Sequence, residues 1–454
     1  MNGSGRSRRW RWAAVAALPL LCGAYFNSCG KMTVGLWPNY AWVPLMDGQQ
    51  GAARETQALG LIDGSHVNSV VLFVPWTTDF FGFHYGTFYD ANCTLQTSRV
   101  KSYVRDFLQK WNAQAIYGGK ELNLHLVLPI HVYEGPAAAR VGPECKGKQT
   151  LLALRDDFET FLDAVLDVVD EPQFLGMNRV ISIGNEVDQY LTRSSCTQGP
   201  PVDCQTCISG ATSANPTDCV SCGSFSDMGT FVTQIRDFIN RRYGTPGVTG
   251  TSTTFMGLWN EASGGWNTCT KDDAVNLFTK GSAIFLTYYP LQAGTFQPLP
   301  PSRVSTHLAK MSELSQAVQA AGGPYTVILQ EVGYPTGYSP ASSPLFGSGS
   351  ASGYTNGISA QADFVDDFFA ALDQNRSRIR AASWWSLFDF ETNLDCTAWD
   401  RLGAPGKEAF CTMGLRKVSG DEKCVSGASS CSDSSWDRYV AGATQAESWD
   451  WPLP

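Results

Sequence analysis

The stretches RVISIGNEVDQY, residues 179–190, and YTVILQEVGYP, residues 325–335, decide the fold. In each stretch, a short run of β-branched residues and leucine leads into a glutamate, Glu186 in the first and Glu331 in the second. The two runs are too short for helices and are typical of strands buried on both faces of a parallel sheet. We therefore expect both glutamates just past the carboxyl ends of parallel strands, where α/β barrels build their active sites.

Strand-like and helix-like segments alternate along the rest of the chain. The predicted strands lie within residues 32–38, 67–75, 122–131, 180–183, 248–259, 283–289, 327–329 and 381–388. Amphipathic helices are predicted at residues 98–111, 151–169, 228–243, 306–321 and 360–379. This alternation around eight strands predicts the α/β class and a closed (β/α)8 TIM barrel rather than an open sheet. On this count Glu186 follows strand four and Glu331 follows strand seven.

The chain is longer than a bare barrel, which has about 250 residues. At 454 residues it leaves room for one catalytic domain over residues 30–454 with a cysteine-rich insertion after strand four, residues 192–226. The insertion contains Cys204-x2-Cys207 and Cys219-x2-Cys222, with Cys196 upstream. Two such pairs fit either a four-thiolate zinc site or, in an exported protein, disulfides. A glycine- and serine-rich segment, residues 339–353, predicts a long loop beside the second glutamate.

The N-terminus combines a basic flank with an apolar stretch. Arginines precede residues 13–26, which are largely apolar and interrupted by Pro19. This pattern fits an export signal or an anchor better than a full membrane span, so we expect residues 1–28 to be a signal peptide or membrane anchor. The protein would then be secreted or held at the cell surface. Its 14 cysteines agree with an oxidising compartment, which favours disulfides over zinc, and no metal is expected.

Net charge bears on the partners. A net charge of −9 disfavours nucleic acid as a partner, and membrane contact is expected only through the N-terminal anchor. The chain has 14 Trp and 16 Tyr, and exposed aromatic faces suit the apolar faces of sugar rings. We expect a polysaccharide or oligosaccharide substrate, no cofactor and a monomer.

The Asn185-Glu186 pair after strand four and Glu331 after strand seven resemble the superfamily of retaining glycoside hydrolases built on (β/α)8 barrels, the clan A type. Around the second glutamate, EVGYPT at residues 331–336 is similar to the Glu-x-Gly-Trp/Tyr-Pro-Ser/Thr motif of family 17, the β-1,3-glucanases and glucanosyltransferases. Three features depart from that family. Gln330 replaces a residue that is usually small, Tyr338 stands where a small or amide residue is expected, and residues 70–80 are nearer to β-mannanase-type relatives.

The resemblance implies roles for these residues. Glu186 would be the acid/base and Glu331 the nucleophile of a double displacement, and Asn185 would hydrogen-bond the sugar 2-hydroxyl. In retaining enzymes the two carboxyl groups lie roughly 5 to 5.5 Å apart. Their pKa values then diverge, so that one is protonated while the other is ionised. Tyr288 or Tyr289, after strand six, would hold Glu331 in place, and Trp384 or Trp385, after strand eight, would form the floor of the sugar site.

Further substrate-binding candidates follow other strands: His131 after strand three and Trp76 after strand two. Adjacent residues of a strand point to opposite faces, so one member of each aromatic pair belongs to the core. The function implied is a secreted endo-β-glycanase, with β-glucan favoured as substrate. A glucanosyltransferase of the same fold, or a catalytically silent barrel that binds polysaccharide, remains an alternative.

Overall fold

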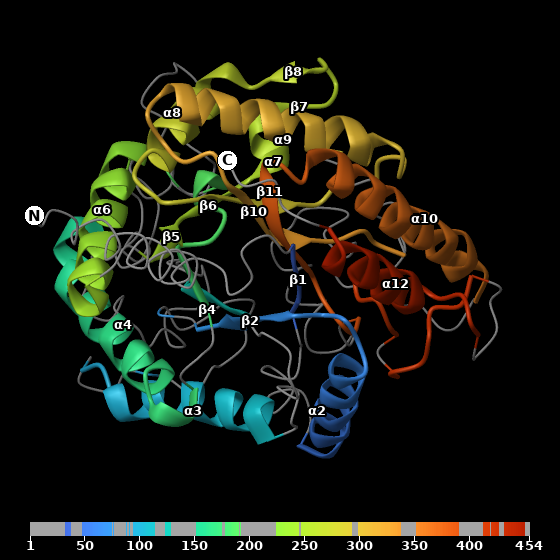
Figure 1. Cartoon of the computed structure of the whole chain (residues 1–454), viewed down its shortest axis with the longest axis horizontal. Coiled ribbons are helices and arrows are strands. Elements are labelled where there is room, and N and C mark those ends of the chain that lie inside the picture. The colour runs from blue at the N-terminus through green and yellow to red at the C-terminus, as the bar shows by residue number, and fades with distance from the viewer. Residues whose placement is uncertain are drawn as a thin grey trace, which may run out of the picture.

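The computed structural model describes the strands and helices of a barrel and part of its loops. The described residues are 32–37, 48–74, 76, 88, 90, 94–113, 123–128, 151–174, 178–189, 191, 224–244, 247–292, 298–336, 351–389, 412–417, 419–425 and 431–449. Figure 1 shows the described helices arranged around a central set of strands.

A parallel sheet forms the centre of the molecule. Its strands are β1 (Thr33–Leu36), β2 (Ser69–Phe73), β3 (Asn123–Leu128), β4 (Asn178–Ile183), β5 (Val248–Gly250), β6 (Ser252–Thr254), β9 (Ile284–Tyr288), β10 (Val327–Val332) and β11 (Ile379–Trp384). They lie in the order β5-β4-β3-β2-β1-β11-β10-β9-β6. Only Thr251 separates β5 from β6, so these two are halves of one strand. Because β5 pairs with β4 and β6 pairs with β9, the fifth strand closes the barrel. The predicted (β/α)8 fold is confirmed.

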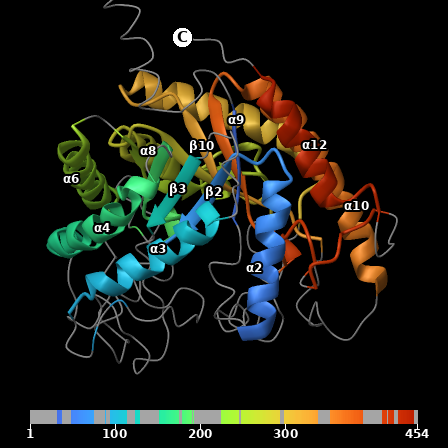
Figure 2. The ribbon, with the colours of Figure 1, turned by 60° about the horizontal axis from the view of Figure 1, so that its bottom comes forward.

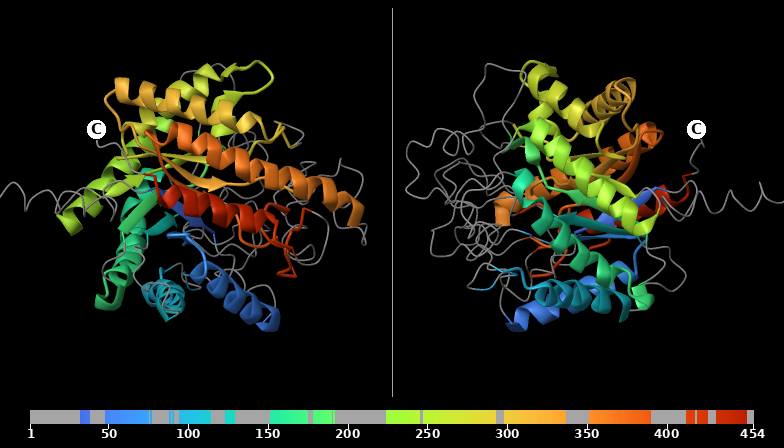
Figure 3. Two further views of the ribbon diagram at one scale, coloured as in Figure 1. Left: turned by 45° about the vertical axis from the view of Figure 1, so that its right-hand side comes forward. Right: turned by 90° about the vertical axis from the view of Figure 1, so that its left-hand side faces the viewer.

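One long helix follows each strand of the barrel. These helices are α2 (Gly48–Asp63), α3 (Thr97–Ala113), α4 (Arg155–Val169), α6 (Phe225–Tyr243), α8 (Thr268–Phe278), α9 (Arg303–Ala320), α10 (Ala351–Asn375) and α12 (Ser435–Glu447). Shorter elements are η5 (Leu151–Leu154), η6 (Pro172–Phe174), η7 (Val187–Gln189), α7 (Phe255–Leu258) and the hairpin β7 (Trp259–Asn260) with β8 (Gly265–Trp266). The five predicted helices are present with shifted ends, whereas α2, α8 and α12 were not predicted. Figure 2 shows α2 and α12 from another side, and in Figure 3 α10 and α12 run side by side.

Alternate strand positions divide the core into two layers. Inside the barrel, a small apolar cluster takes inward residues from β4, β5, β10 and β11 and two from β9 and its start: Val180, Val248, Ala283, Phe285, Ile328 and Ala381. Their sequence neighbours, such as Ile181, Leu286 and Leu329, belong to the larger cluster between the strands and the helices. This alternation of inward and outward side chains, called strand parity below, continues to the strand ends. It decides which side chains face the mouth of the barrel.

The start of α6 corrects the boundary of the predicted insertion. Ser224 caps this helix, and its hydroxyl and the Asp227 carboxylate exchange hydrogen bonds with each other's backbone N–H groups. Residues 224–226 therefore belong to the helix and its cap, not to the insertion. Residues 192–223, with all the cysteines of the insertion, lie outside the described residues.

A disulfide is present late in the chain instead. Cys424 and Cys431 are bonded, with their Cα atoms 5.8 Å apart, and Cys269 is also disulfide-bonded. Among the described residues, Glu422 joins this pair as a cluster of potential metal ligands, but the two sulfurs are already bonded to each other. None of the described helices combines the length and apolar character needed to cross a bilayer. The predicted signal at residues 1–28 lies outside the described part.

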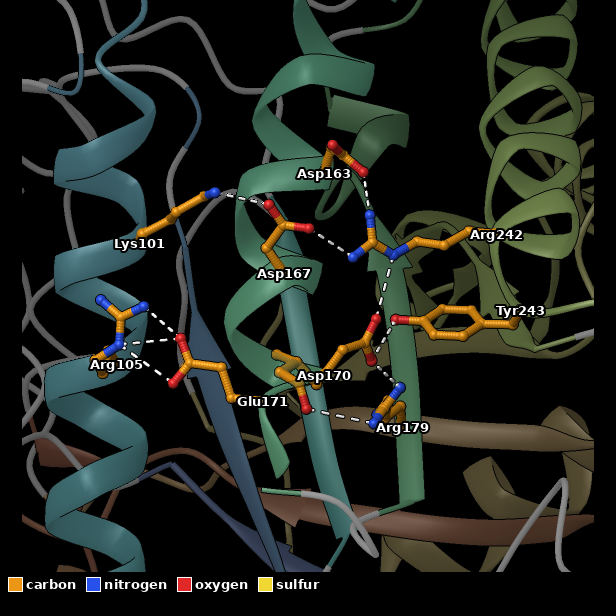
Figure 4. Close-up of polar contacts among 10 residues, drawn as sticks. Lys101, Arg105, Asp163, Asp167, Asp170, Glu171, Arg179, Arg242 and Tyr243 are labelled. Carbon is orange, nitrogen blue, oxygen red and sulfur yellow. Dashed lines mark hydrogen bonds and ion pairs between the residues drawn. The ribbon is translucent and has the colours of Figure 1, made fainter. Parts of the chain in front are cut away.

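Ion pairs connect three consecutive helices on the outside of the barrel. Arg242 of α6 reaches three carboxylates of α4 and its C-terminal end, on Asp163, Asp167 and Asp170 (Figure 4). Two cations of α3 contact the same helix end from the other side: Lys101 pairs with Asp167 and Arg105 with Glu171. Networks of this kind stabilise more than isolated surface pairs do. Arg179 of β4 joins the network through its own ion pair with Asp170, so the network also connects these helices to a strand of the barrel.

Candidate active site

Glu186 lies on a tight turn just beyond β4. The turn begins at Gly184, whose φ is +81° and whose N–H donates to the Leu128 carbonyl of β3 over 2.8 Å. A Cβ at Gly184 would lie 2.9 Å from the Val187 side chain, so glycine is required there. Glu186 itself has a φ of +49°, in the left-handed region that non-glycine residues rarely adopt. Such outliers often mark functional sites.

Two contacts hold Glu186 in this conformation. Its backbone N–H donates to the Ser252 hydroxyl of β6 over 3.0 Å, and its carboxylate accepts a hydrogen bond of 2.7 Å from the Thr287 hydroxyl of β9. The side chain is half-buried, so one part remains accessible. The first predicted glutamate is therefore fixed toward the strands of the second half of the barrel.

Glu331 lies within β10, not just past it as predicted. The strand carries a β-bulge at Gln330, because Leu329 pairs with Leu286 of β9 and Glu331 pairs with the next residue, Thr287. β10 therefore has one residue more than β9 at this point, and that extra residue is Gln330. In a regular strand Gln330 and Glu331 would point to opposite faces, whereas the bulge turns both toward the barrel interior. Val332 then faces the outer core.

The Asn185 amide lies between these elements. Its Nδ2 donates to Glu331 Oε1 over 3.1 Å, and its Oδ1 accepts from the Ser252 hydroxyl over 2.9 Å and from Gln330 Nε2 over 2.5 Å. The second oxygen of Glu331, Oε2, accepts from the Tyr289 hydroxyl over 2.5 Å. Both oxygens of Glu331 therefore carry a donor, which is the arrangement that favours an ionised carboxylate.

Burial opposes that stabilisation. Glu331 is 4% exposed, and its burial raises the pKa to about 7, against the hydrogen bonds from Tyr289 and Asn185 that lower it. Burial, together with the negative charge of Glu331, holds the pKa of Tyr289 well above its ordinary value, so the phenol stays a donor. The carboxyl group of Glu331 is thus able to take up and release a proton near neutral pH, a property typical of catalytic carboxyl groups.

Strand β9 brings the two carboxyl groups to one place. Thr287, which donates to Glu186, is also the pairing partner of Glu331 in the sheet. Paired residues of neighbouring strands lie about 5 Å apart. Tyr289, which donates to Glu331, is two residues further along the chain, just past the end of β9, and on the same face. The predicted juxtaposition of Glu186 and Glu331 at the carboxyl end of the barrel is therefore what the structure shows.

Three predicted substrate-binding residues are placed elsewhere. Tyr288 is fully buried on the outer face of β9, where its hydroxyl contacts His307 Nδ1 at 2.9 Å. Trp384 faces the helices, with its Nε1 donating to the Met413 carbonyl over 2.9 Å. Trp76 packs edge-on against Phe158, with ring centroids 5.1 Å apart. These predictions were wrong, because strand parity turns the first two outward and the third lies in the helix layer. His131 lies outside the described residues.

The other member of each aromatic pair faces inward. Tyr289 reaches Glu331, and the ring of Trp385 lies 4.7 Å from that of Trp37, which in turn lies 5.6 Å from Phe73. Trp37 was not predicted, nor were two further contacts of the glutamates, Ser252 and Thr287. Trp37 and Thr287 are inward-facing residues near the carboxyl ends of β1 and β9, and Ser252 faces inward from the fifth strand. The alternation of side chains along each strand is the signal that would have found them.

Known proteins match the chain in fold only. No protein-family model matches it, and no curated protein matches it in sequence. A solved structure of a GH5_18 protein from Bifidobacterium longum subsp. infantis has a TM-score of 0.54 at 14% identity, covering 93% of this chain and 80% of that one. The exo-β-1,4-mannosidase Op5Man5 from Opitutaceae bacterium strain TAV5 has a TM-score of 0.53 at 14% identity over 94% of this chain. The match covers 62% of the mannosidase's own length.

Family 17 is represented more distantly. A β-1,3-glucanosyltransferase of glycoside hydrolase family 17 from Rhizomucor miehei has a TM-score of 0.39 at 9% identity, over 84% of this chain and 90% of that one. A score this low carries no argument for family 17 in particular. At these identities the comparisons show a fold, and it is the predicted one, the (β/α)8 barrel.

Proposed function

We propose that this chain is a retaining glycoside hydrolase that cleaves a β-linked polysaccharide by double displacement. The observation that carries the proposal is that Glu186 and Glu331 accept from Thr287 and Tyr289, two same-face residues at the end of β9, while Asn185 also donates to Glu331. The sequence motifs give the assignment of roles, with Glu331 as nucleophile and Glu186 as acid/base. The shared fold of the two barrels compared above agrees with it.

The chemistry follows from these positions. Ionised Glu331 attacks the anomeric carbon and forms a glycosyl-enzyme, while protonated Glu186 gives its proton to the departing glycosidic oxygen. Glu186 then takes a proton from water, whose oxygen attacks the same carbon and releases Glu331. Tyr289 and Asn185 stabilise the charge of Glu331 before the attack and after the release. Asn185 would also donate to the sugar 2-hydroxyl, a contact that strengthens in the transition state.

The substrate class is proposed from the motif and the site. EVGYPT at residues 331–336 favours β-glucan, and an endo mode of action was expected from the sequence. One of the two barrels compared above is an exo-β-1,4-mannosidase, which adds β-mannan as the first alternative. The inward rings of Trp37 and Trp385 pack against each other, and the Trp37 indole donates to the carbonyl of Gln330, the residue before Glu331. Laminarin, mixed-linkage glucan, mannan and galactan therefore form the screening panel.

Matched variants test the assignment. We expect Glu186→Gln and Glu331→Gln to lose at least ~10²- to 10⁴-fold in turnover, while Glu313→Gln, at an exposed glutamate of α9, leaves it unchanged. Near-normal turnover in either site variant would end the proposal. A wild-type protein that binds a polysaccharide of the panel and hydrolyses none of them would instead be the catalytically silent barrel.

The stereochemical course tests the mechanism separately. Proton NMR of the first product should show the β-configuration of the substrate, because two inversions occur at one carbon. A 2-deoxy-2-fluoro glycoside with a good leaving group should label the peptide that contains Glu331, as read by mass spectrometry. Initial release of the inverted anomer would refute double displacement. Adding sugar acceptors distinguishes hydrolysis from transfer.

We also propose that the protein is exported. The basic flank and apolar stretch of residues 1–28 support this, and so do the disulfides at Cys424–Cys431 and Cys269. N-terminal sequencing of protein recovered from the medium and from the membrane fraction would distinguish a cleaved signal from a retained anchor. Recovery from the reducing cytosol alone would contradict export.

A further inference from the structure

Gln330 occupies the bulge of β10 immediately before Glu331, a place where family 17 usually has a small residue. We propose that Gln330 is a positioning residue: its amide fixes the orientation of the Asn185 amide, so that Asn185 presents its NH2 group to ionised Glu331 and to the sugar. The inference rests on the proposed function, because it assigns a role within that same site. A series of hydrogen bonds that runs from Glu331 through Asn185 to Gln330 supports it.

The series of hydrogen bonds starts at Glu331. An ionised carboxylate only accepts hydrogen bonds, so the group of Asn185 that lies 3.1 Å from Glu331 Oε1 must be the NH2 group. The Asn185 carbonyl oxygen therefore points away from Glu331, toward Gln330 and Ser252. Gln330 Nε2 lies 2.5 Å from that oxygen. If Asn185 were turned over, its NH2 group would face the Gln330 NH2 group and two donors would oppose each other.

Ser252 cannot fix the orientation by itself. Its hydroxyl lies 2.9 Å from the Asn185 oxygen, but a hydroxyl both donates and accepts, and its proton rotates to suit either orientation. The Gln330 NH2 group only donates. Of these two neighbours of the Asn185 oxygen, Gln330 is thus the one that discriminates between the two orientations of the amide.

The backbone holds Gln330 in position for this contact. The bulge turns the Gln330 side chain inward together with that of Glu331, and Trp37 Nε1 donates to the Gln330 carbonyl over 3.0 Å. The Gln330 side chain is fully buried. Within the described part of the chain, its Oε1 has no hydrogen-bond partner. A buried acceptor left unsatisfied is costly, so the amide is not explained by burial alone, whereas the contact of its other end with Asn185 explains it.

The orientation of the Gln330 amide also bears on the ionisation of Glu331. A protonated Glu331 needs an acceptor for its hydroxyl, and in this arrangement the Asn185 oxygen points away from Glu331, toward the Gln330 NH2 group. The arrangement therefore favours the ionised form of Glu331. The titratable groups facing Glu331 from the neighbouring described elements are Glu186, whose carboxylate accepts from Thr287, the pairing partner of Glu331, and Tyr289, whose hydroxyl donates to Glu331.

Two variants of similar size separate this role from packing. Gln330→Met keeps the side-chain length without a donor, and Gln330→Glu puts an acceptor where the NH2 group was. We expect kcat/KM below neutral pH to fall roughly 10- to 100-fold in Gln330→Met and further in Gln330→Glu. The acid limb of the pH profile should move upward by about half to one pH unit in Gln330→Met. The loss should be smaller on a 2-deoxy substrate, which makes no contact with Asn185 through that hydroxyl.

Gln361→Met is the matched control. Gln361 is also fully buried, its Nε2 donates to backbone carbonyls, including that of Tyr334 at 2.7 Å, and its Oε1 is likewise without a partner in the described part of the chain. Its replacement should lower stability without moving the acid limb. The inference is overturned if the limb of Gln330→Met coincides with that of wild type, or if Gln330→Met loses the same factor on the normal and the 2-deoxy substrates.

A readout without substrate keeps the inference separate from the proposed function. The protonation of Glu331 also affects thermal stability. The difference in stability between Glu331→Gln and wild type changes over the pH range in which Glu331 titrates. When both proteins also carry Gln330→Met, that pH range should move upward by about half to one pH unit, as far as the acid limb does. If the range moves but no glycoside is cleaved, the positioning role stands and the proposed function fails. If the range does not move, the positioning role fails.

Discussion

Replacing Glu331 by glutamine should stabilise the protein above neutral pH while abolishing turnover. The pKa of Glu331 is raised by burial from an ordinary value of 4.5 to about 7. Because the folded-state value is the higher one, folding favours the protonated form. The stability associated with that proton is fully present below pH 4.5, declines between pH 4.5 and 7, and is lost above pH 7. The glutamine variant has no such charge to bury.

The size of the effect follows from the shift. At about 1.4 kcal/mol per pKa unit, wild type is less stable above pH 7 by about 3 kcal/mol than it would be without the buried charge. The new amide keeps the hydrogen bond from Tyr289 but presents an NH2 group near that of Asn185, which reduces the gain. We therefore expect a gain of about 1 to 3 kcal/mol at pH 8. For a chain of this length that corresponds to a rise in Tm of roughly 1 to 3 °C.

Differential scanning calorimetry of wild type, Glu331→Gln and Glu313→Gln at pH 4, 6 and 8 would measure this. Glu313, an exposed residue paired with Lys310, controls for the general effect of removing a surface carboxylate. The gain of Glu331→Gln over wild type should be largest at pH 8 and absent at pH 4. A Glu331→Gln variant that is destabilised equally at all three pH values would refute the reasoning. In that case the hydrogen bonds of the carboxylate would stabilise the protein, and burial of its charge would not destabilise it.

Three further predictions concern residues around the site and on the outer face. Tyr289→Phe removes the donor to Glu331 Oε2, so the acid limb of kcat/KM should move upward by roughly one pH unit; an unchanged limb would contradict this. Trp37→Phe leaves the Gln330 carbonyl buried without its indole donor, and urea unfolding should show a loss of about 1 to 3 kcal/mol in the free energy of unfolding. No loss would mean that other contacts hold the bulge. Arg242→Met leaves three carboxylates of the α4 region without their shared cation, and the resulting drop in Tm should be smaller in high salt; a drop independent of salt would mean lost packing.

The strands were predictable because barrel strands are buried on both faces and therefore read as continuous apolar runs. The missed helices lack that kind of signal. In α12, Gly442 lies on the buried face, where a Cβ would come within 2.1 Å of the Phe369 ring. A helix that packs through glycine and alanine shows no stripe of large apolar residues. In α2 the buried apolar residues of the described part are Ala58, Leu59 and Ile62, all in its last two turns, and these are too few to form a stripe.

The sequence predicts that neighbouring strand residues face opposite sides, but not which of the two sides is the interior. The sequence shows that Tyr288 and Tyr289 must point to opposite faces, but which one faces the interior depends on the inward position of Phe285 earlier in the strand. A run in which every residue is apolar gives no sign of which face is which. Contacts across the barrel are harder still. Trp37 lies 293 positions from Gln330 in the chain, and nothing in either local pattern refers to the other.

The bulge explains why the least typical residue of the second motif is informative. A bulge is one residue too many relative to a neighbouring strand, so β10 alone does not reveal it, and in a regular strand Gln330 and Glu331 would face opposite sides. With the extra residue, both reach Asn185. A small residue at position 330 would leave the Asn185 amide free to turn. The departure from the family pattern therefore lies where this barrel controls the ionisation of Glu331, which would set the pH range of the proposed reaction.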